Sequence, residues 1–291
     1  METQHYYCSD DGARIAYRLR RRDHSGTALV MLHGLASNSS RWSELVDTLT
    51  LDPPWDLLRL DLRGHGGSLV RGRIGHAVWC EDLHGILAQA GYRRVVLLGH
   101  SLGAQLALHY AHGHPHMTAG LILIDPVVPQ CLQGTLARVA RLRGLLPPLI
   151  TILRLLNAAG IKRRHFPTLD LQQLDRRTRE LLRHQPDTRI DKIYARPLSD
   201  LKYLPTANYL QDLYAATAPL PPLADLQAPV LVLLSRGVKL TDLSQTQARL
   251  ARLPNTEFKI IDADHWMLTE RPDEARLAIQ DWCNRRAVAS Q

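Results

Sequence analysis

Short, mostly apolar runs alternate with helical patterns along much of this chain, and no other sequence feature constrains the fold as strongly. The apolar runs are at 28–32, 57–60, 95–98, 121–124, 230–234 and 258–261, and helical patterns occupy 41–49, 77–90 and 102–111. Strands buried on both faces of a parallel sheet have this continuous apolar character. Alternating strands and helices predict an α/β fold with a doubly wound, mostly parallel sheet.

The alternation stops after Asp125 and resumes near Pro229. Between these points, the pattern of residues 127–220 predicts helices rich in Arg and Leu, with prolines at the boundaries between them. A length of 291 residues is enough for one α/β domain that carries an insertion. We therefore predict a core formed by residues 1–126 and 221–291, and a helical cap, or lid, at 127–220.

The segment Gly99-His100-Ser101-Leu102-Gly103 lies between an expected strand and an expected helix. A G-x-S-x-G motif in that context forms a sharp turn that exposes the serine hydroxyl above the sheet. Glycines on either side leave room where a Cβ would clash, and the following helix points its first N–H groups at the same place. The motif predicts that Ser101 is a nucleophile.

Four segments resemble motifs of the α/β-hydrolase family and follow that family's order. They are His33-Gly34-Leu35 after an early strand, Asp-Leu-Arg-Gly-His-Gly-Gly-Ser at 61–68, the turn around Ser101, and Asp264-His265-Trp266 after the last strand. The resemblance spans nearly the whole chain outside the insertion. The insertion itself occupies the place where this family carries its cap.

The resemblance implies a catalytic serine with an oxyanion hole. It makes Ser101 the nucleophile and His265 its general base, and it assigns the oxyanion donors to the backbone amides of Leu35 and Leu102. A developing oxyanion needs two preorganised N–H donors, and histidine titrates near neutral pH. The residues expected to shape the second donor loop or to line the substrate site are His33, Gly34 and His100.

The third catalytic residue departs from the family pattern. The family usually places an Asp shortly after the strand at 230–234, but this chain has Val238 and Lys239 there. Three explanations remain: the acid has moved to Asp125 at the end of the preceding strand, Asp242 reaches back from the next helix, or the acid is lost. We predict Asp125, because adjacent strand ends can both reach one histidine.

A serine nucleophile with a histidine base predicts acyl transfer that needs no metal or organic cofactor. We expect hydrolysis of a small-molecule carboxylic ester with a hydrophobic acyl chain, although the fold alone does not separate esters from amides, thioesters or lactones. The alternative is a non-catalytic or weakly catalytic small-molecule receptor on the same scaffold, which the missing acid supports.

His112, His114 and His116 suit a solvated loop better than a metal site.

The formal net charge of +8 favours anionic partners, but no nucleic-acid-binding motif accompanies it, so we predict no nucleic-acid partner. The apolar stretch from Leu145 to Ile161 ends in Lys162-Arg163-Arg164. A helix of this kind could line an acyl pocket or contact an anionic membrane surface peripherally. We expect it to pack on the core with its charges in water.

The four cysteines form no C-x-x-C pair and suit a reducing compartment. The N-terminus is polar and has no apolar signal region. The most apolar stretch, at 144–161, is interrupted by Pro147-Pro148 and Arg154 and is too broken to span a bilayer. We expect a cytoplasmic protein, and the sequence leaves the oligomeric state open.

Overall fold

The computed structural model describes residues 1–22, 27–237 and 240–288, and these form one eight-stranded sheet in the order β1-β2-β4-β3-β5-β6-β7-β8. The β1–β2 and β2–β4 pairs are antiparallel and the other neighbours are parallel. The strands are β1 (Glu2–Cys8), β2 (Arg14–Arg20), β3 (Ala28–Leu32), β4 (Asp56–Leu60), β5 (Val95–His100), β6 (Thr118–Ile124), β7 (Val230–Ser235) and β8 (Thr256–Ile261). The predicted fold class, α/β with a mostly parallel sheet, is confirmed.

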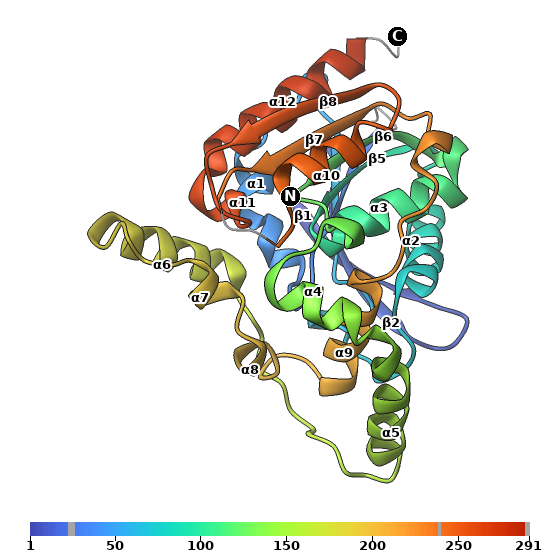
Figure 1. Cartoon of the computed structure of the whole chain (residues 1–291). Coiled ribbons are helices and arrows are strands. Elements are labelled where there is room, and N and C mark those ends of the chain that lie inside the picture. Colours follow the sequence, from blue (N-terminus) through green and yellow to red (C-terminus); the bar gives the residue numbers. More distant parts are fainter. Residues whose placement is uncertain (23–26, 238–239, 289–291) are drawn as a thin grey trace.

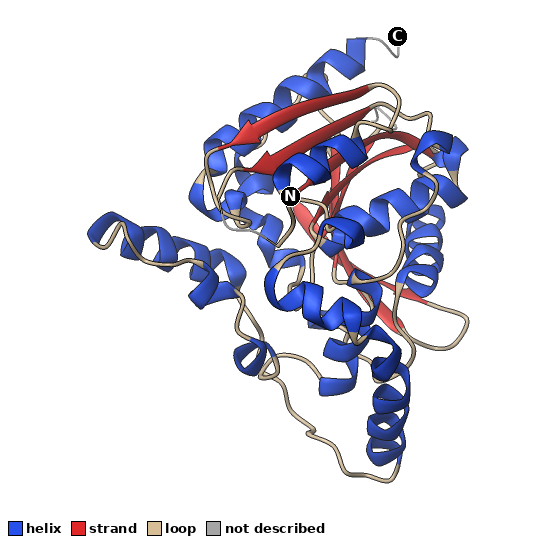
Figure 2. Cartoon of the chain, viewed as in Figure 1, coloured by secondary structure: helices blue, strands red, loops and turns tan. Residues whose placement is uncertain are grey.

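Helices cover both faces of the sheet (Figure 2). One face packs against α1 (Ser43–Thr48), α11 (Met267–Glu270) and α12 (Pro272–Val288). The other face packs against α2 (His76–Ala90), α3 (Leu102–Gly113) and α10 (Leu243–Leu250).

Strand β3 explains why its sequence is apolar at every position. Leu29 and Met31 belong to the cluster under α1 and α12, whereas Ala28, Val30 and Leu32 belong to the cluster under α2 and α3. Alternate side chains of a strand point to opposite faces, and here both faces are covered. A strand in this position must therefore be hydrophobic throughout.

Between β6 and β7 the chain leaves the sheet and forms a run of helices, within residues 127–220, that we refer to as the insertion. Its helices are α4 (Gly134–Arg141), α5 (Leu146–Ala158), α6 (Leu171–His184), α7 (Asp191–Tyr194), α8 (Pro197–Asp200) and α9 (Thr206–Ala216). It contacts the core through α6, which meets α11, and through α9, which meets α3. In Figure 1, α5 projects at the lower end of the molecule and α6 lies at the left.

None of the helices in the described part of the chain combines the length and the apolar character that crossing a bilayer would require.

Candidate active site

Ser101 occupies the single position between β5 and α3. Its backbone is in a strained region, with φ 57° and ψ −116°, as expected of a nucleophile turn between strand and helix. A Cβ on Gly99 would lie 2.3 Å from the Gly103 carbonyl oxygen, and one on Gly103 would lie 2.1 Å from the Leu32 carbonyl oxygen. Only glycine fits at either position, so the two glycines allow the close approach that the turn needs.

Two backbone segments flank Ser101. Leu102 is the first residue of α3, so its N–H has no partner within the helix. The loop after β3 lies on the other side, where a Cβ on Gly34 would come within 3.1 Å of the Ser101 Cβ. Leu35 follows directly in that loop. The structure thus brings both segments predicted to supply oxyanion donors next to the serine.

The His33 side chain supports this loop through hydrogen bonds to backbone groups. It is fully buried, its Nε2 accepts the Leu62 N–H at 3.0 Å, and its Nδ1 lies 2.9 Å from the Gly34 carbonyl oxygen. Burial, and next the neighbouring His65, lower the pKa of His33 to about 3. The ring is therefore neutral and donates from Nδ1. Because both nitrogens are bonded to backbone, the side chain fixes the loop and offers no group to a substrate.

Asp125 and His265 meet at the carboxyl ends of neighbouring strands. The Asp125 Oδ2 atom lies 3.3 Å from His265 Nδ1, and both side chains are largely buried. Asp125 follows β6 with φ 40°, and it accepts the backbone N–H of Ser235 at 2.7 Å and the Ser235 hydroxyl at 2.5 Å. These two hydrogen bonds from the end of β7 fix the carboxylate where it faces the ring.

The other candidates for the acid are placed differently. Asp242 caps α10, where its carboxylate accepts the Gln245 N–H at 2.9 Å. Val238 and Lys239, at the position where the family usually carries its acid, lie outside the described residues. Of the two aspartates considered from the sequence, Asp125 is the one that contacts His265.

His100 holds the His265 loop. Its Nε2 lies 3.0 Å from the His265 carbonyl oxygen, and the two rings are 4.8 Å apart between centroids. Burial, and next the charge of His265, lower the pKa of His100 well below its usual range, so the neutral ring donates this hydrogen bond. Within the described residues, no hydrogen bond joins the Ser101 hydroxyl to the His265 ring.

A cavity of about 240 Å³ opens beside Asp125 and His265. Its wall is largely polar and includes Gln133, Thr241 and Asp242. Ser101 is not among the residues that line it.

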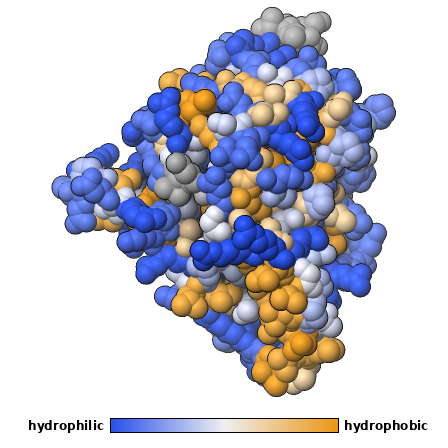
Figure 3. Space-filling view, viewed as in Figure 1, coloured by the Kyte–Doolittle hydropathy of each residue, from blue (hydrophilic) through white to orange (hydrophobic). Residues whose placement is uncertain are grey.

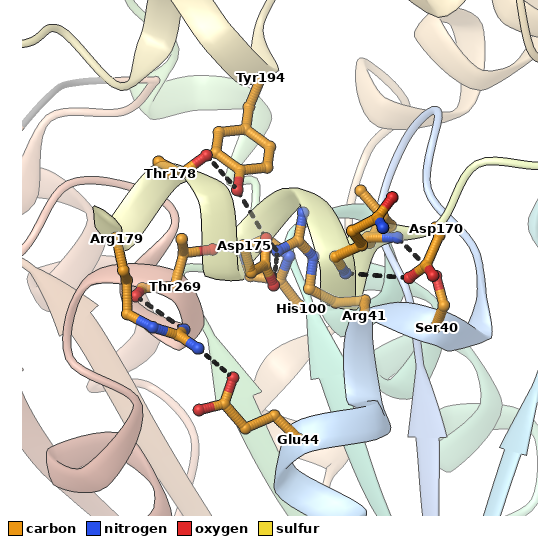
Figure 4. Close-up of polar contacts among 12 residues, drawn as sticks. Ser40, Arg41, Glu44, His100, Asp170, Asp175, Thr178, Arg179, Tyr194 and Thr269 are labelled. Carbon is orange, nitrogen blue, oxygen red and sulfur yellow. Dashed lines mark hydrogen bonds and ion pairs between the residues drawn. The ribbon is translucent and has the colours of Figure 1, made fainter. Parts of the chain in front are cut away.

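The insertion is anchored next to this site by a buried ion pair that sequence reasoning missed (Figure 4). Arg41, in the turn before α1, contacts Asp175 of α6 at 2.7 Å and the Thr269 hydroxyl at 3.0 Å. The Tyr194 hydroxyl donates to the same Asp175 carboxylate at 2.6 Å. Arg41 and Asp175 are 134 residues apart, and no motif marks either of them in the sequence.

The same anchor reaches the loop that carries His265. The Tyr194 ring stacks on Trp266 with centroids 5.4 Å apart, and Trp266 meets the His265 ring edge-on at 5.4 Å. A second ion pair, between Arg179 and Glu44 at 2.6 Å, lies alongside (Figure 4). The insertion therefore packs directly against the loop that carries His265.

The segment at 61–68 is structural. The Asp61 carboxylate accepts the backbone N–H groups of Ser39 at 2.7 Å and of Gly67 at 2.8 Å. His65 contacts Asp212 of α9 at 2.8 Å, and both side chains are buried. The segment thus ties the loops around the site to each other and to the insertion.

The chain belongs to the alpha/beta hydrolase fold family, since the sequence model of that family matches residues 27–272. Solved structures agree on the fold. A hydrolase from Pseudomonas aeruginosa PA01 gives a TM-score of 0.66 at 21% identity, covering 96% of this chain and 97% of that one. An esterase from Exiguobacterium antarcticum gives 0.68 at 17% identity, covering 96% and 98%.

Curated relatives match a shorter stretch. The chain is 30% identical over 111 residues to the sn-1-specific diacylglycerol lipase ABHD11 of Mus musculus, which is 38% of this chain and 36% of that protein. It is 30% identical over 135 residues to epoxide hydrolase 3 of Xenopus tropicalis, 45% of this chain and 36% of that protein. The matched part is about a third of each relative's length. The chain has the alpha/beta hydrolase fold, and proteins named as a diacylglycerol lipase and an esterase are similar to it.

Proposed function

We propose that the protein is a serine hydrolase that cleaves a carboxylic ester with a hydrophobic acyl chain through an acyl-enzyme on Ser101. The observation that carries the proposal is the Asp125–His265 contact of 3.3 Å, beside a serine held in a strained turn between strand and helix. This arrangement supplies a nucleophile, a base and a group that orients the base.

In the proposed mechanism, His265 removes the proton from the Ser101 hydroxyl as the oxygen attacks the ester carbon. The backbone N–H groups of Leu35 and Leu102 stabilise the oxyanion. His265 then protonates the leaving alcohol, and water, activated by the same histidine, releases the acid. Asp125 holds the ring through Nδ1 and stabilises its positive charge. No step requires a metal or an organic cofactor.

The separation of Ser101 and His265 is compatible with this role. Catalytic hydrogen bonds are often long in unliganded enzymes and shorten when the substrate binds. We propose that the insertion acts as the cap over the substrate, because its anchor at Arg41 and Asp175 lies next to the His265 loop.

The ester assignment draws on the names of similar proteins. A diacylglycerol lipase and an esterase are among them, and both names describe hydrolysis of carboxylic esters. An epoxide hydrolase and a synthase are also similar to the chain, so the assignment depends on the serine, which an acyl-enzyme requires.

A fluorophosphonate probe tests the nucleophile. We expect rapid labelling of the wild-type protein, loss of labelling in Ser101→Ala, and unchanged labelling in Ser244→Ala, a serine outside the proposed machinery. A series of nitrophenyl esters of graded chain length then tests the acyl preference. A flat response along the series would contradict the hydrophobic acyl chain, and absent labelling would favour the small-molecule receptor instead.

A further inference from the structure

Helix α5 and its flanks expose an unusual amount of apolar surface. Seven of the thirteen exposed large apolar side chains among the described residues lie between positions 142 and 161. They are Leu142, Leu145, Leu149, Ile152, Leu155, Leu156 and Ile161. Only Ile150 of α5 is buried. The expectation that this helix packs on the core is therefore wrong.

The exposed side chains form one stripe. Leu145, Leu149, Ile152 and Leu156 follow the spacing of a single helical face. In Figure 3 the corresponding apolar patch covers the lower end of the molecule, where Figure 1 places α5. An isolated exposed leucine needs no explanation, whereas a contiguous apolar stripe indicates a surface that binds something.

The residues around the stripe are cationic. Between Asp125 and Asp170 there is no acidic residue, and there are seven Lys or Arg residues. They are Arg138, Arg141, Arg143, Arg154, Lys162, Arg163 and Arg164. This segment alone accounts for +7 of the net charge of +8. No ion pair with a described acidic residue neutralises any of the seven.

A shallow groove runs along another side of α5, and Leu145, Leu149, Ile152 and Leu156 do not line it. It has a volume of about 470 Å³, and its wall contains Arg71, Arg154 and Lys162 beside Leu155 and Ala158 of α5. Three cations next to one exposed leucine suit a ligand with a phosphate group and an attached hydrocarbon region. Phospholipid headgroups at the surface of a bilayer present that combination.

We infer that α5 and its basic flanks are a peripheral docking surface for an anionic phospholipid bilayer. The apolar face enters the boundary between headgroups and acyl chains while the cations face the lipid phosphates. A second copy of this chain fits less well, because a symmetric contact would bring two sets of seven unneutralised cations together. The inference goes beyond the proposed ester hydrolysis and does not depend on it.

Sedimentation with vesicles tests the inference, using phosphatidylcholine alone and phosphatidylcholine mixed with phosphatidylglycerol. We expect the wild-type protein to bind the anionic vesicles, to bind the neutral ones at least about tenfold more weakly, and to dissociate as salt is added. The variant Leu149→Glu/Ile152→Glu/Leu155→Glu should lose binding to both. The variant Arg141→Gln/Arg154→Gln/Lys162→Gln should lose the preference for anionic vesicles.

Two controls make the result specific. Leu277→Glu changes an exposed leucine on α12, away from α5, and should bind vesicles like the wild type. Ser101→Ala should also bind normally, which separates docking from catalysis. Equal binding by the wild type and the triple Glu variant would overturn the inference. A stable dimer that the triple Glu variant converts to monomers, with no vesicle binding, would overturn it in favour of a second copy.

Discussion

Arg41 of the core and Asp175 of the insertion form an ion pair in which one guanidinium nitrogen lies 2.7 Å from both carboxylate oxygens. The two side chains are 4% and 6% exposed, so neither charge can be solvated if its partner is lost. The pair also meets Thr269 and Tyr194, and therefore connects three segments that are distant in the sequence.

Removing one partner of this pair should destabilise the protein strongly. Arg41→Met leaves Asp175 as a buried charge without its cation, and breaking a buried pair in this way costs about 3–5 kcal/mol. Urea unfolding of the wild type and the variant measures the difference in the free energy of unfolding.

The double variant Arg41→Met/Asp175→Leu provides the internal comparison. It replaces both charges with apolar groups, and such replacements are often neutral or stabilising, so it should recover most of the loss. Arg183→Gln, at an exposed ion pair on the same helix, should have no measurable effect. If the double variant loses as much free energy of unfolding as Arg41→Met and Asp175→Leu lose together, the ion pair is not the anchor described above.

The position of the proposed catalytic acid, Asp125, gives a second prediction. Asp125→Asn should lower kcat for ester hydrolysis by about 10⁴, because the amide no longer stabilises the His265 cation or fixes its tautomer. Asp242→Asn should leave kcat unchanged, since Asn caps a helix as well as Asp does. Steady-state kinetics on one nitrophenyl ester distinguishes the two sites, and a large loss in Asp242→Asn alone would assign the acid to the α10 residue.

These two sites show which parts of the molecule the sequence could predict. The strands and the Ser101 turn were predictable because continuous apolar runs and paired glycines have local physical causes. Asp125 was predictable only as one of several options, since its Ser235 partner lies 110 residues away. The Arg41–Asp175 pair was not predictable, because pairing across the insertion leaves no periodicity. The exposure of α5 was missed because an apolar helix has the same sequence whether it packs on the core or not.

Close packing at the serine turn gives a third prediction. Gly103→Ala would place a Cβ 2.1 Å from the Leu32 carbonyl oxygen and 2.6 Å from that of His33. Both are backbone atoms, so α3 or the loop after β3 must move, and we expect a loss of about 1–3 kcal/mol in the free energy of unfolding. Labelling of Ser101 by the fluorophosphonate should also slow, since the same movement displaces the Leu35 amide.

Gly113→Ala is the matched control on the same helix. A Cβ there meets nothing within 4 Å, and alanine is favoured over glycine in helices by up to about 1 kcal/mol. This variant should be as stable as the wild type or slightly more stable, with normal labelling. Comparable destabilisation by both substitutions would mean that the contact with Leu32 and His33 does not set the cost.

The buried ring of His33 gives a prediction for the effect of pH. In the unfolded chain a histidine takes up a proton near pH 6.5, but in the folded protein the pKa of His33 is lowered to about 3, first by burial. Between these values the unfolded state binds more protons than the folded state, so stability falls as the pH decreases. The slope from this one group reaches about 1.4 kcal/mol per pH unit.

The variant His33→Gln isolates this contribution. A glutamine can still accept from the Leu62 N–H and donate to the Gly34 carbonyl group, but it does not titrate. Its free energy of unfolding, measured in urea from pH 7 to pH 4, should decrease less steeply than that of the wild type. The difference between the two slopes should reach up to about 1.4 kcal/mol per pH unit, the contribution of one proton. His112→Gln, on the exposed end of α3, controls for the substitution itself. Identical slopes for His33→Gln and the wild type would show that the His33 ring is already charged in the folded protein.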